Sequence, residues 1–193
     1  MWIKRIITHI PNTLTILNLL CGCTSIVMAF NGDLRNSAIF LLLAFHADVF
    51  DGLTARLLKV QSAIGKELDS LADLLSFGLA PAVILHVIMK NEMAIETFSF
   101  SLPPGKWIPL LIPFLLTVFS ALRLAKFNND ENQEDAFVGL PTPANALMVI
   151  SLPLIAFRQP ESFVMDWFST PFGIIVYSVG IYPHDCTNSF VRT

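Results

Sequence analysis

Long apolar stretches separated by short polar links dominate this chain. A helix that crosses a bilayer needs roughly 20 consecutive, largely apolar residues. We therefore predict membrane helices over residues 13–30, 36–58, 67–89, 106–127, 143–157 and, more weakly, 167–182. This pattern predicts an all-α polytopic membrane protein, built as a single transmembrane domain over residues 1–182 with an atypical polar tail at 183–193.

Two of the polar links carry signals for helix ends. Residues 59–66 form a short link before the third predicted helix, and Gly65 is expected there to relieve a tight reversal of the chain. Thr142 is placed as the N-cap of the fifth helix, with Pro143 at its first helical position. The acidic, amide-rich residues 128–135 are expected to be a solvated connector.

Composition excludes an ordinary soluble protein. Of the 193 residues, 54% are hydrophobic and only 14% are charged, and the mean hydropathy is +0.64, well away from the average for soluble domains. The net charge is only −3 and there is no basic run, so we expect no nucleic-acid partner. The three cysteines do not have the spacing of a metal site.

The distribution of basic residues predicts the orientation in the membrane. If the N-terminus lies inside, eight basic residues face the cytoplasm and four face outward, which favours a multi-pass protein of the inner (cytoplasmic) membrane with a cytoplasmic N-terminus. The inner set is Lys4, Arg5, Arg56, Lys59, Lys66, Arg123, Lys126 and Arg192, and the outer set is Arg35, Lys90, Lys106 and Arg158.

Four aspartates stand inside these apolar stretches, at the predicted cytoplasmic ends of the second and third helices. They are Asp48, Asp51, Asp69 and Asp73. An ionised carboxylate near hydrocarbon costs several kcal/mol, so such residues usually mark a functional site. Each pair shares one helix face, because the spacings are i, i+3 and i, i+4. Four converging carboxylates would repel one another without divalent cations between them. The pattern therefore predicts a site for two ions, Mg²⁺ or Mn²⁺, of the kind that supports phosphoryl transfer.

The residues around the aspartates fit a phosphate-bearing substrate. Gly52 and Ala55 leave room on the same helix turns for a base or phosphate to approach the backbone. The planar guanidinium of Arg56 suits phosphate oxygens. Asp73 lies one turn deeper than Asp69, which suits a general base that removes a hydroxyl proton.

A cation or proton transporter also uses intramembrane carboxylates, and it is the alternative to an enzyme. A single aspartate can also serve as a structural hydrogen-bonding group or as part of a proton path. Against a cation transporter, the four carboxylates gather near one membrane face and are not spread across the midplane.

The complete aspartate pattern resembles a known family motif. Asp48-x2-Asp51-Gly52-x2-Ala55-Arg56-x8-Gly65-x3-Asp69-x3-Asp73 is similar, without departure, to the motif of the CDP-alcohol phosphatidyltransferases. The resemblance implies a core of six membrane helices and transfer of a substituted phosphate from a CDP-linked lipid to an alcohol, with release of CMP. It further implies that Asp48, Asp51 and Asp69 are metal ligands and that Asp73 is the general base and also touches a metal. By the same resemblance, Gly52, Ala55 and Arg56 hold the CDP group, and Gly65 belongs to the substrate-binding motif.

Two further segments narrow the acceptor. Residues 10–18, which read Ile-Pro-Asn-Thr-Leu-Thr-x2-Asn, are similar to the N-terminal segment common in this superfamily. Residues 123–128 and 137–146 resemble the corresponding stretch of the bacterial integral-membrane phosphatidylserine synthases. This implies CDP-diacylglycerol and L-serine as substrates, with Arg123 either binding phosphate or the serine carboxylate or acting only as an interfacial anchor.

Other members of the family would use the same aspartates with glycerol 3-phosphate or an inositol phosphate. Such acceptors carry a phosphate and should need more basic residues than Arg123 and Lys126 provide outside the motif. The resemblance covers about residues 8–160 and also implies a homodimer. The tail departs from it, since relatives continue with apolar helix after Tyr177. We expect a weak or truncated last helix, which leaves an inactive relative as a further alternative.

Overall fold

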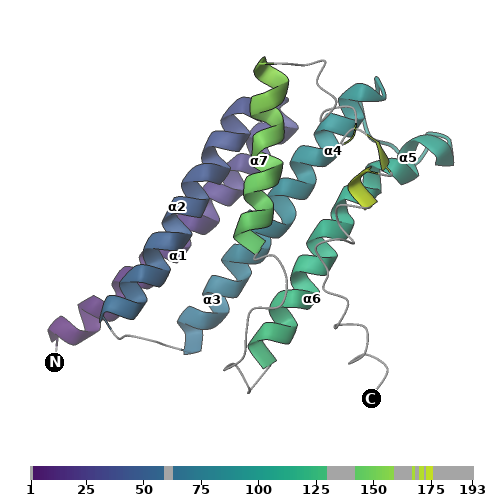
Figure 1. The fold of residues 1–193 in the computed structure, drawn as a ribbon. Coiled ribbons are helices and arrows are strands. Elements are labelled where there is room, and N and C mark those ends of the chain that lie inside the picture. The colour runs from purple at the N-terminus through teal and green to yellow at the C-terminus, as the bar shows by residue number, and fades with distance from the viewer. Residues whose placement is uncertain are drawn as a thin grey trace.

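The computed structural model describes residues 2–58, 63–129 and 142–158, together with Trp167, Thr170, Pro171 and 173–175. All regular elements in these residues are helical (Figure 1). The prediction of an all-α fold is therefore confirmed. Most of the predicted sixth helix, the connector after Asn129 and the whole tail at 183–193 lie outside the described residues.

Most helices run along the length of the bundle (Figure 1), and two of the long membrane segments consist of several consecutive helical elements. In chain order they are α1 (Trp2–Phe30), α2 (Leu34–Leu58), α3 (Ala63–Asp73), the π-helical turn η1 (Leu74–Leu79), α4 (Ala80–Glu92), α5 (Pro104–Leu111), the 3-10 turn η2 (Ile112–Phe114), α6 (Leu115–Asn129) and α7 (Thr142–Arg158).

Four stretches among the described residues are long and apolar enough to cross a membrane. They are Pro11–Phe30, Leu34–Leu58, Ile64–Glu92 and Pro104–Lys126, and α7 adds a shorter apolar helix at Pro143–Ile155. These stretches correspond to the first five predicted helices. The chain is therefore an integral membrane protein.

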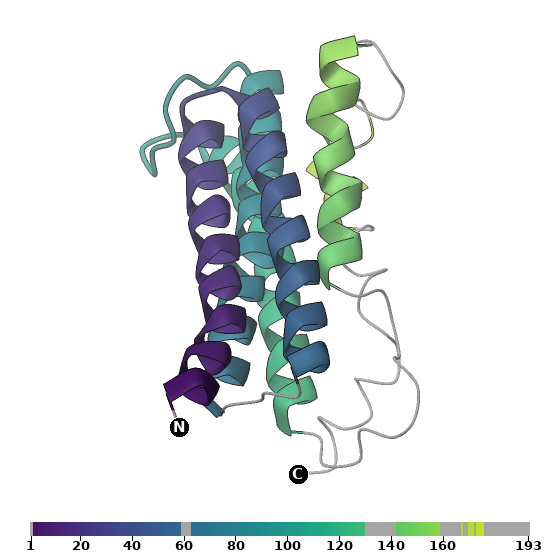
Figure 2. The same ribbon diagram turned by 90° about the vertical axis from the view of Figure 1, so that its left-hand side faces the viewer.

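A tight turn joins α1 and α2 into an antiparallel hairpin. Gly32 adopts a φ of 81° there, a conformation that glycine reaches without steric cost. Asp33 caps α2, since its Oδ1 accepts a hydrogen bond of 3.1 Å from the backbone N–H of Asn36. In Figures 1 and 2 the α1–α2 pair runs alongside the rod formed by α3, η1 and α4, while α7 packs against α2 and α4.

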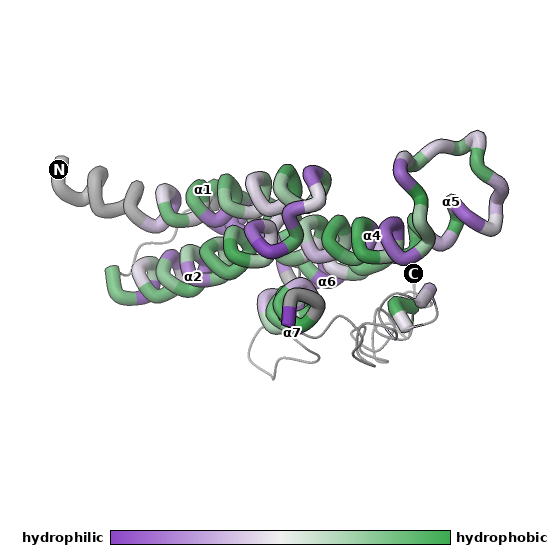
Figure 3. Tube along the Cα trace, turned by 90° about the horizontal axis from the view of Figure 1, so that it is seen from above, coloured by the Kyte–Doolittle hydropathy of each residue, from purple (hydrophilic) through white to green (hydrophobic). Residues whose placement is uncertain are grey.

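The centre of the bundle is the α4 rod. Every residue from Ala80 to Met89 is buried there, which requires apolar residues on all sides of that helix. Large apolar side chains also face outward elsewhere, among them Leu17, Leu20 and Val27 on α1. Figure 3 shows hydrophobic positions along much of α2 and α4. Apolar residues on both the inner and the outer surface are expected of a bundle surrounded by lipid.

The π-helical turn η1 interrupts the third membrane segment directly after Asp73. The backbone N–H of Ala80 bonds to the carbonyl of Leu75, five residues earlier. Helix α6 holds this turn through two residues. Thr117 donates through Oγ1 to the carbonyl of Gly78 at 3.1 Å, and a Cβ added to Gly78 would meet the Cβ of Ser120 at 3.2 Å. Such turns occur frequently at functional sites.

Three predicted helix starts need correction. The third helix begins at Ala63, so Gly65 lies inside the first turn of α3 and does not form the reversal. A glycine costs only about 1 kcal/mol within a helix, which the flanking helical residues tolerate. The helix that holds the first membrane span begins at Trp2 with Pro11 inside it, although the span itself starts at Pro11. Thr142 is already helical and is not an N-cap.

Candidate metal centre

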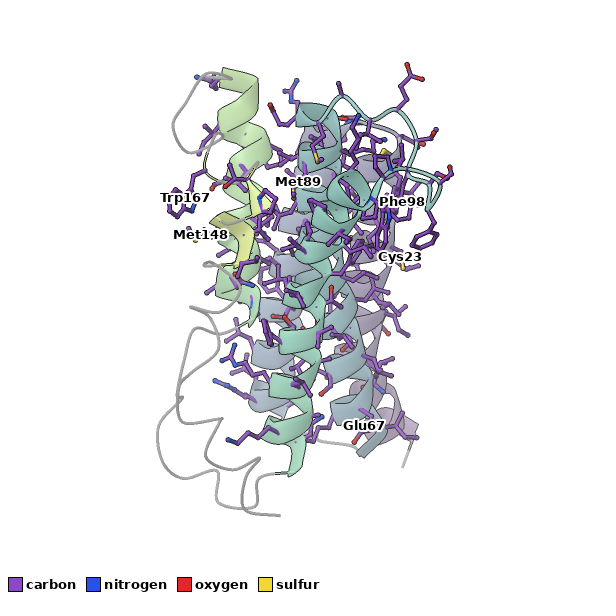
Figure 4. All side chains as sticks on the ribbon, turned by 90° about the vertical axis from the view of Figure 1, so that its right-hand side faces the viewer. Cys23, Glu67, Met89, Phe98, Met148 and Trp167 are labelled. Atoms are coloured by element: carbon purple, nitrogen blue, oxygen red, sulfur yellow. The ribbon has the colours of Figure 1, made fainter. Side chains whose placement is uncertain are left out.

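The two helices that carry the aspartates meet at one end of the bundle. The C-terminal end of α2 and the start of α3 lie at the end that also holds the N-terminus (Figure 1). Figure 4 shows Glu67 at this end, with Met89 and Phe98 toward the opposite one. Asp48 and Asp51 on α2 therefore approach Asp69 and Asp73 across an antiparallel pair of helices.

Three of the four carboxylates form a compact group. Oxygen atoms of Asp48, Asp51 and Asp69 all lie within 4.8 Å of one another. Asp73 is not a member of this group, but its carboxyl group lies within hydrogen-bonding reach of Asp48. The structure thus brings together all four aspartates of the predicted site, with three converging and the fourth beside them.

The oxygen atoms of this cluster fit a divalent cation. Asp51 is 5% exposed, and its Oδ2 and the Oδ1 of Asp73 are buried without a hydrogen-bond partner. Buried polar atoms nearly always have partners, and uncompensated buried carboxylates are especially costly. Hard cations such as Mg²⁺ take carboxylate oxygens as ligands. A cation among these oxygens would remove both the repulsion and the missing contacts.

Helix α1 adds two polar residues to the site that lie outside the aspartate motif. The Thr15 hydroxyl donates to the carbonyl of Pro11 at 3.1 Å and lies beside the Asp51 carboxylate. Asn18, one turn further along α1, is fully buried, and neither its Oδ1 nor its Nδ2 has a hydrogen-bond partner. The signal in the sequence was two polar residues at i, i+3 spacing on one face of an apolar span.

The residues predicted to hold CDP lie on the turns of α2 that follow Asp51. A Cβ added to Gly52 would meet no other atom within 4 Å, so the space beside this glycine is open. Ala55 is half-buried and Arg56 is exposed. Gly65 is half-buried on the first turn of α3. The open space predicted beside the carboxylates is therefore present at Gly52, and the binding of CDP there stays a prediction.

Arg123 lies on α6, where two contacts define its height in the bundle. Before it on α6, Ser120 packs against Gly78. After it, Asn128 donates through Nδ2 to Ser70 Oγ at 2.8 Å. The half-buried Arg123 is therefore level with the part of the third membrane segment that directly follows Asp73.

Comparisons with known proteins find relatives among the phosphatidyltransferases. The family model described as CDP-alcohol phosphatidyltransferase matches residues 8–178. A CDP-diacylglycerol–serine O-phosphatidyltransferase of Mycobacterium leprae is 33% identical over 178 residues, which cover 89% of this chain and 54% of that protein. The Bacillus subtilis protein of the same name is 31% identical over 144 residues, 75% of each chain. An archaetidylserine synthase of Methanothermobacter thermautotrophicus is 32% identical over 168 residues, which cover 84% of this chain and 66% of that protein. The chain spans about half the length of several curated relatives that it matches, the Mycobacterium leprae protein among them.

Proposed function

This chain belongs to the CDP-alcohol phosphatidyltransferase family, and we propose that it transfers the phosphatidyl group of CDP-diacylglycerol to L-serine, giving phosphatidylserine and CMP. The observation that carries the proposal is the convergence of Asp48, Asp51 and Asp69, whose oxygens lie within 4.8 Å of one another. The names of the relatives from Mycobacterium leprae and Bacillus subtilis support serine as the acceptor.

The reaction needs one proton transfer and one displacement at phosphorus. Asp73 takes the proton from the serine hydroxyl. The resulting oxygen attacks the phosphorus next to diacylglycerol, and the bond from that phosphorus to the oxygen bridging the two phosphates breaks. CMP leaves with the electron pair of that bond. The proton held by Asp73 then passes to solvent, which restores the base for the next turnover.

Asp48, Asp51 and Asp69 are proposed to hold two divalent cations, Mg²⁺ or Mn²⁺, which Asp73 also touches. Cations held at these oxygens would neutralise charge on the diphosphate and on the departing CMP. Arg56 supplies a guanidinium group for the phosphate oxygens, and Gly52 and Ala55 leave room for the nucleotide. Gly65 and Arg123 are proposed to complete the substrate-binding surface, with Arg123 facing a phosphate or the serine carboxylate.

The site is proposed to face the cytoplasm from the inner membrane. The excess of basic residues on the side of the chain that carries the aspartates supports this orientation. CMP and serine are soluble, so a site at that face would exchange both with the cytoplasm while the lipid tails stay between helices. We further propose a homodimer, by analogy with the family.

The test is incorporation of radiolabelled L-serine into extractable lipid by the purified protein. Label should enter lipid only when CDP-diacylglycerol and Mg²⁺ or Mn²⁺ are both present. Asp51→Asn should abolish incorporation, while Glu92→Gln should not, because Glu92 is an exposed acidic residue at the far end of α4. Absence of incorporation by the folded wild-type protein would contradict the proposal.

A further inference from the structure

Asn18 is a buried polar side chain whose hydrogen-bonding groups are all unused. Its side chain is fully buried in α1, and both Oδ1 and Nδ2 lack partners. The contact of Asn18 with another helix is made by its backbone carbonyl, which accepts from Ser76 Oγ at 3.2 Å. Leaving a buried donor or acceptor unsatisfied costs about 1–3 kcal/mol for each group. Such a cost is expected where a ligand, when bound, supplies the missing partners.

Another buried polar residue on α1, Ser25, does have hydrogen-bond partners for its side chain. Ser25 is also fully buried, yet its hydroxyl reaches the carbonyl of Ser37 on α2 at 2.9 Å and the hydroxyl of Ser37 at 3.0 Å. Ser25 therefore links α1 to α2 as a structural residue. Asn18 makes no such link through its side chain.

Contacts with both neighbouring helices define the level of Asn18. Two contacts align α1 with the antiparallel helix α2. Thr15 on α1 lies beside Asp51 on α2, and Ser25 on α1 contacts Ser37 on α2. Position 18, one turn beyond Thr15, is therefore level with the turn that holds Asp48. The other contact is with η1, where a Cβ on Gly22 would meet the Cα of Ser76 at 3.0 Å.

The third segment runs in the same direction as α1, since both begin at the same end of the bundle (Figure 1). Asn18 lies one turn before Gly22, which contacts Ser76. Because the two helices are parallel, Asn18 is level with the turn before Ser76, and that turn holds Asp73. Side chains on a helix lean toward its N-terminus. This lean directs the Asn18 carboxamide toward Thr15 and the carboxylate cluster.

We propose that Asn18 binds the polar end of the acceptor, a zwitterionic amino acid that carries a hydroxyl group. Its Nδ2 donates to the carboxylate of that amino acid, and its Oδ1 accepts from the ammonium group. This inference rests on the proposed function, in which Asp73 takes the proton of the acceptor hydroxyl. The acceptor must then lie beside Asp73, at the level of Asn18.

The chemistry of an amide distinguishes between acceptor classes. A neutral carboxamide offers one donor group and one acceptor group, which match the two charged ends of an amino acid. A phosphate monoester offers only acceptor oxygens to its surroundings and is better matched by a cationic side chain. Asn18 would therefore select for the amino acid over a phosphorylated alcohol.

The experiment compares Asn18→Leu and Asn18→Ala with the wild-type protein and with Ser25→Ala. We expect the Asn18 variants to raise the KM for L-serine at least tenfold. The KM for CDP-diacylglycerol and the affinity for Mn²⁺ should stay unchanged. Thermal melting in detergent provides the second readout. Asn18→Leu should melt at or above the wild-type temperature, because it removes unsatisfied polar groups at similar size. Ser25→Ala should melt lower and keep the wild-type KM for serine.

The outcomes separate this inference from the proposed function. If the wild-type protein releases CMP without any dependence on serine, the proposed function fails and the inference fails with it. If the wild-type protein is serine-dependent and the Asn18 variants keep its KM for serine, only the inference is wrong. It is also wrong if the variants change the affinity for Mn²⁺ or CDP-diacylglycerol instead. Loss of folded protein in both Asn18 variants would assign the amide a structural role and overturn it.

Discussion

The hydroxyl of Ser76 donates a hydrogen bond of 3.2 Å to the backbone carbonyl of Asn18, which joins the π-helical turn η1 to α1. The two helices approach closely here because Gly22 has no side chain. Asp73 lies three residues before Ser76, so this contact also fixes the position of Asp73 relative to α1. The candidate site is therefore built from three helices, although the family motif lies on only two of them.

The close approach at Gly22 predicts a specific loss of stability. In Gly22→Ala the new Cβ would meet the Cα and Cβ of Ser76 at 3.0 Å, closer than normal packing allows. Overpacking of this kind costs about 1–3 kcal/mol, and the better helix propensity of alanine returns about 1 kcal/mol. We expect a lower melting temperature in detergent.

Gly105→Ala is the matched control for that substitution. Gly105 also lies in a helix, on the first turn of α5, but a Cβ there would meet nothing within 4 Å. Its melting temperature should be equal to or slightly above that of the wild-type protein. Equal melting of both glycine variants would show that α1 and η1 do not depend on the contact.

The two roles proposed for the aspartates can be separated by binding and turnover. Asp73→Asn should reduce kcat by about 10²–10⁴-fold, the usual contribution of a general base. It should weaken Mn²⁺ binding less than Asp51→Asn, because Asp73 lies outside the group of three converging carboxylates. Electron paramagnetic resonance of bound Mn²⁺ gives the affinity. Wild-type turnover in folded Asp73→Asn would refute its assignment as the base.

Thr15 is expected to orient Asp51 when its hydroxyl turns from the carbonyl of Pro11 to the carboxylate beside it. Thr15→Val keeps the shape of the side chain and removes the hydroxyl beside the carboxylate. Partners that orient metal ligands commonly contribute 10–100-fold to metal affinity, so we expect Mn²⁺ binding to weaken about tenfold. Thr15→Ser should restore it. Loss in Thr15→Ser alone would point to packing of the methyl group, which valine keeps, and would contradict a role for the hydroxyl.

The hydrogen bond between Asn128 and Ser70 ties the end of α6 to α3. Its length is 2.8 Å, and its loss should cost about 1 kcal/mol. Asn128→Ala and Ser70→Ala should each lower stability by that amount, and the double variant should lose little more than either alone. Additive losses in this double-mutant cycle would mean that the two side chains do not interact in the membrane-embedded protein.

Much of the candidate site could be predicted because its residues are close in sequence and unusual in context. The spacing of Asp48, Asp51, Asp69 and Asp73 determines which helix faces they share, and the short link between the two helices keeps both pairs at the same end of the bundle. Convergence of the carboxylates follows from these two facts. The compact group of three in the structure agrees with this reasoning.

The features that were missed depend on contacts between distant segments. The π-helical turn after Asp73 is stabilised by a hydrogen bond from Thr117 on α6. No local pattern in residues 74–79 predicts this turn. The role proposed for Asn18 depends on its burial and on the positions of α2 and η1, which the sequence does not show. Gly65 was misplaced because glycine signals a turn more often than it occupies the first turn of a helix.

The most direct test of the account is CMP release by the purified protein with CDP-diacylglycerol and Mn²⁺. L-serine, glycerol 3-phosphate and an inositol phosphate are supplied in parallel reactions, each repeated after removal of the metal with a chelator. A serine-specific, metal-dependent transferase should release CMP with L-serine alone, lose this release after chelation, and recover it when Mn²⁺ or Mg²⁺ is returned. Release with a phosphorylated acceptor and none with L-serine would contradict it.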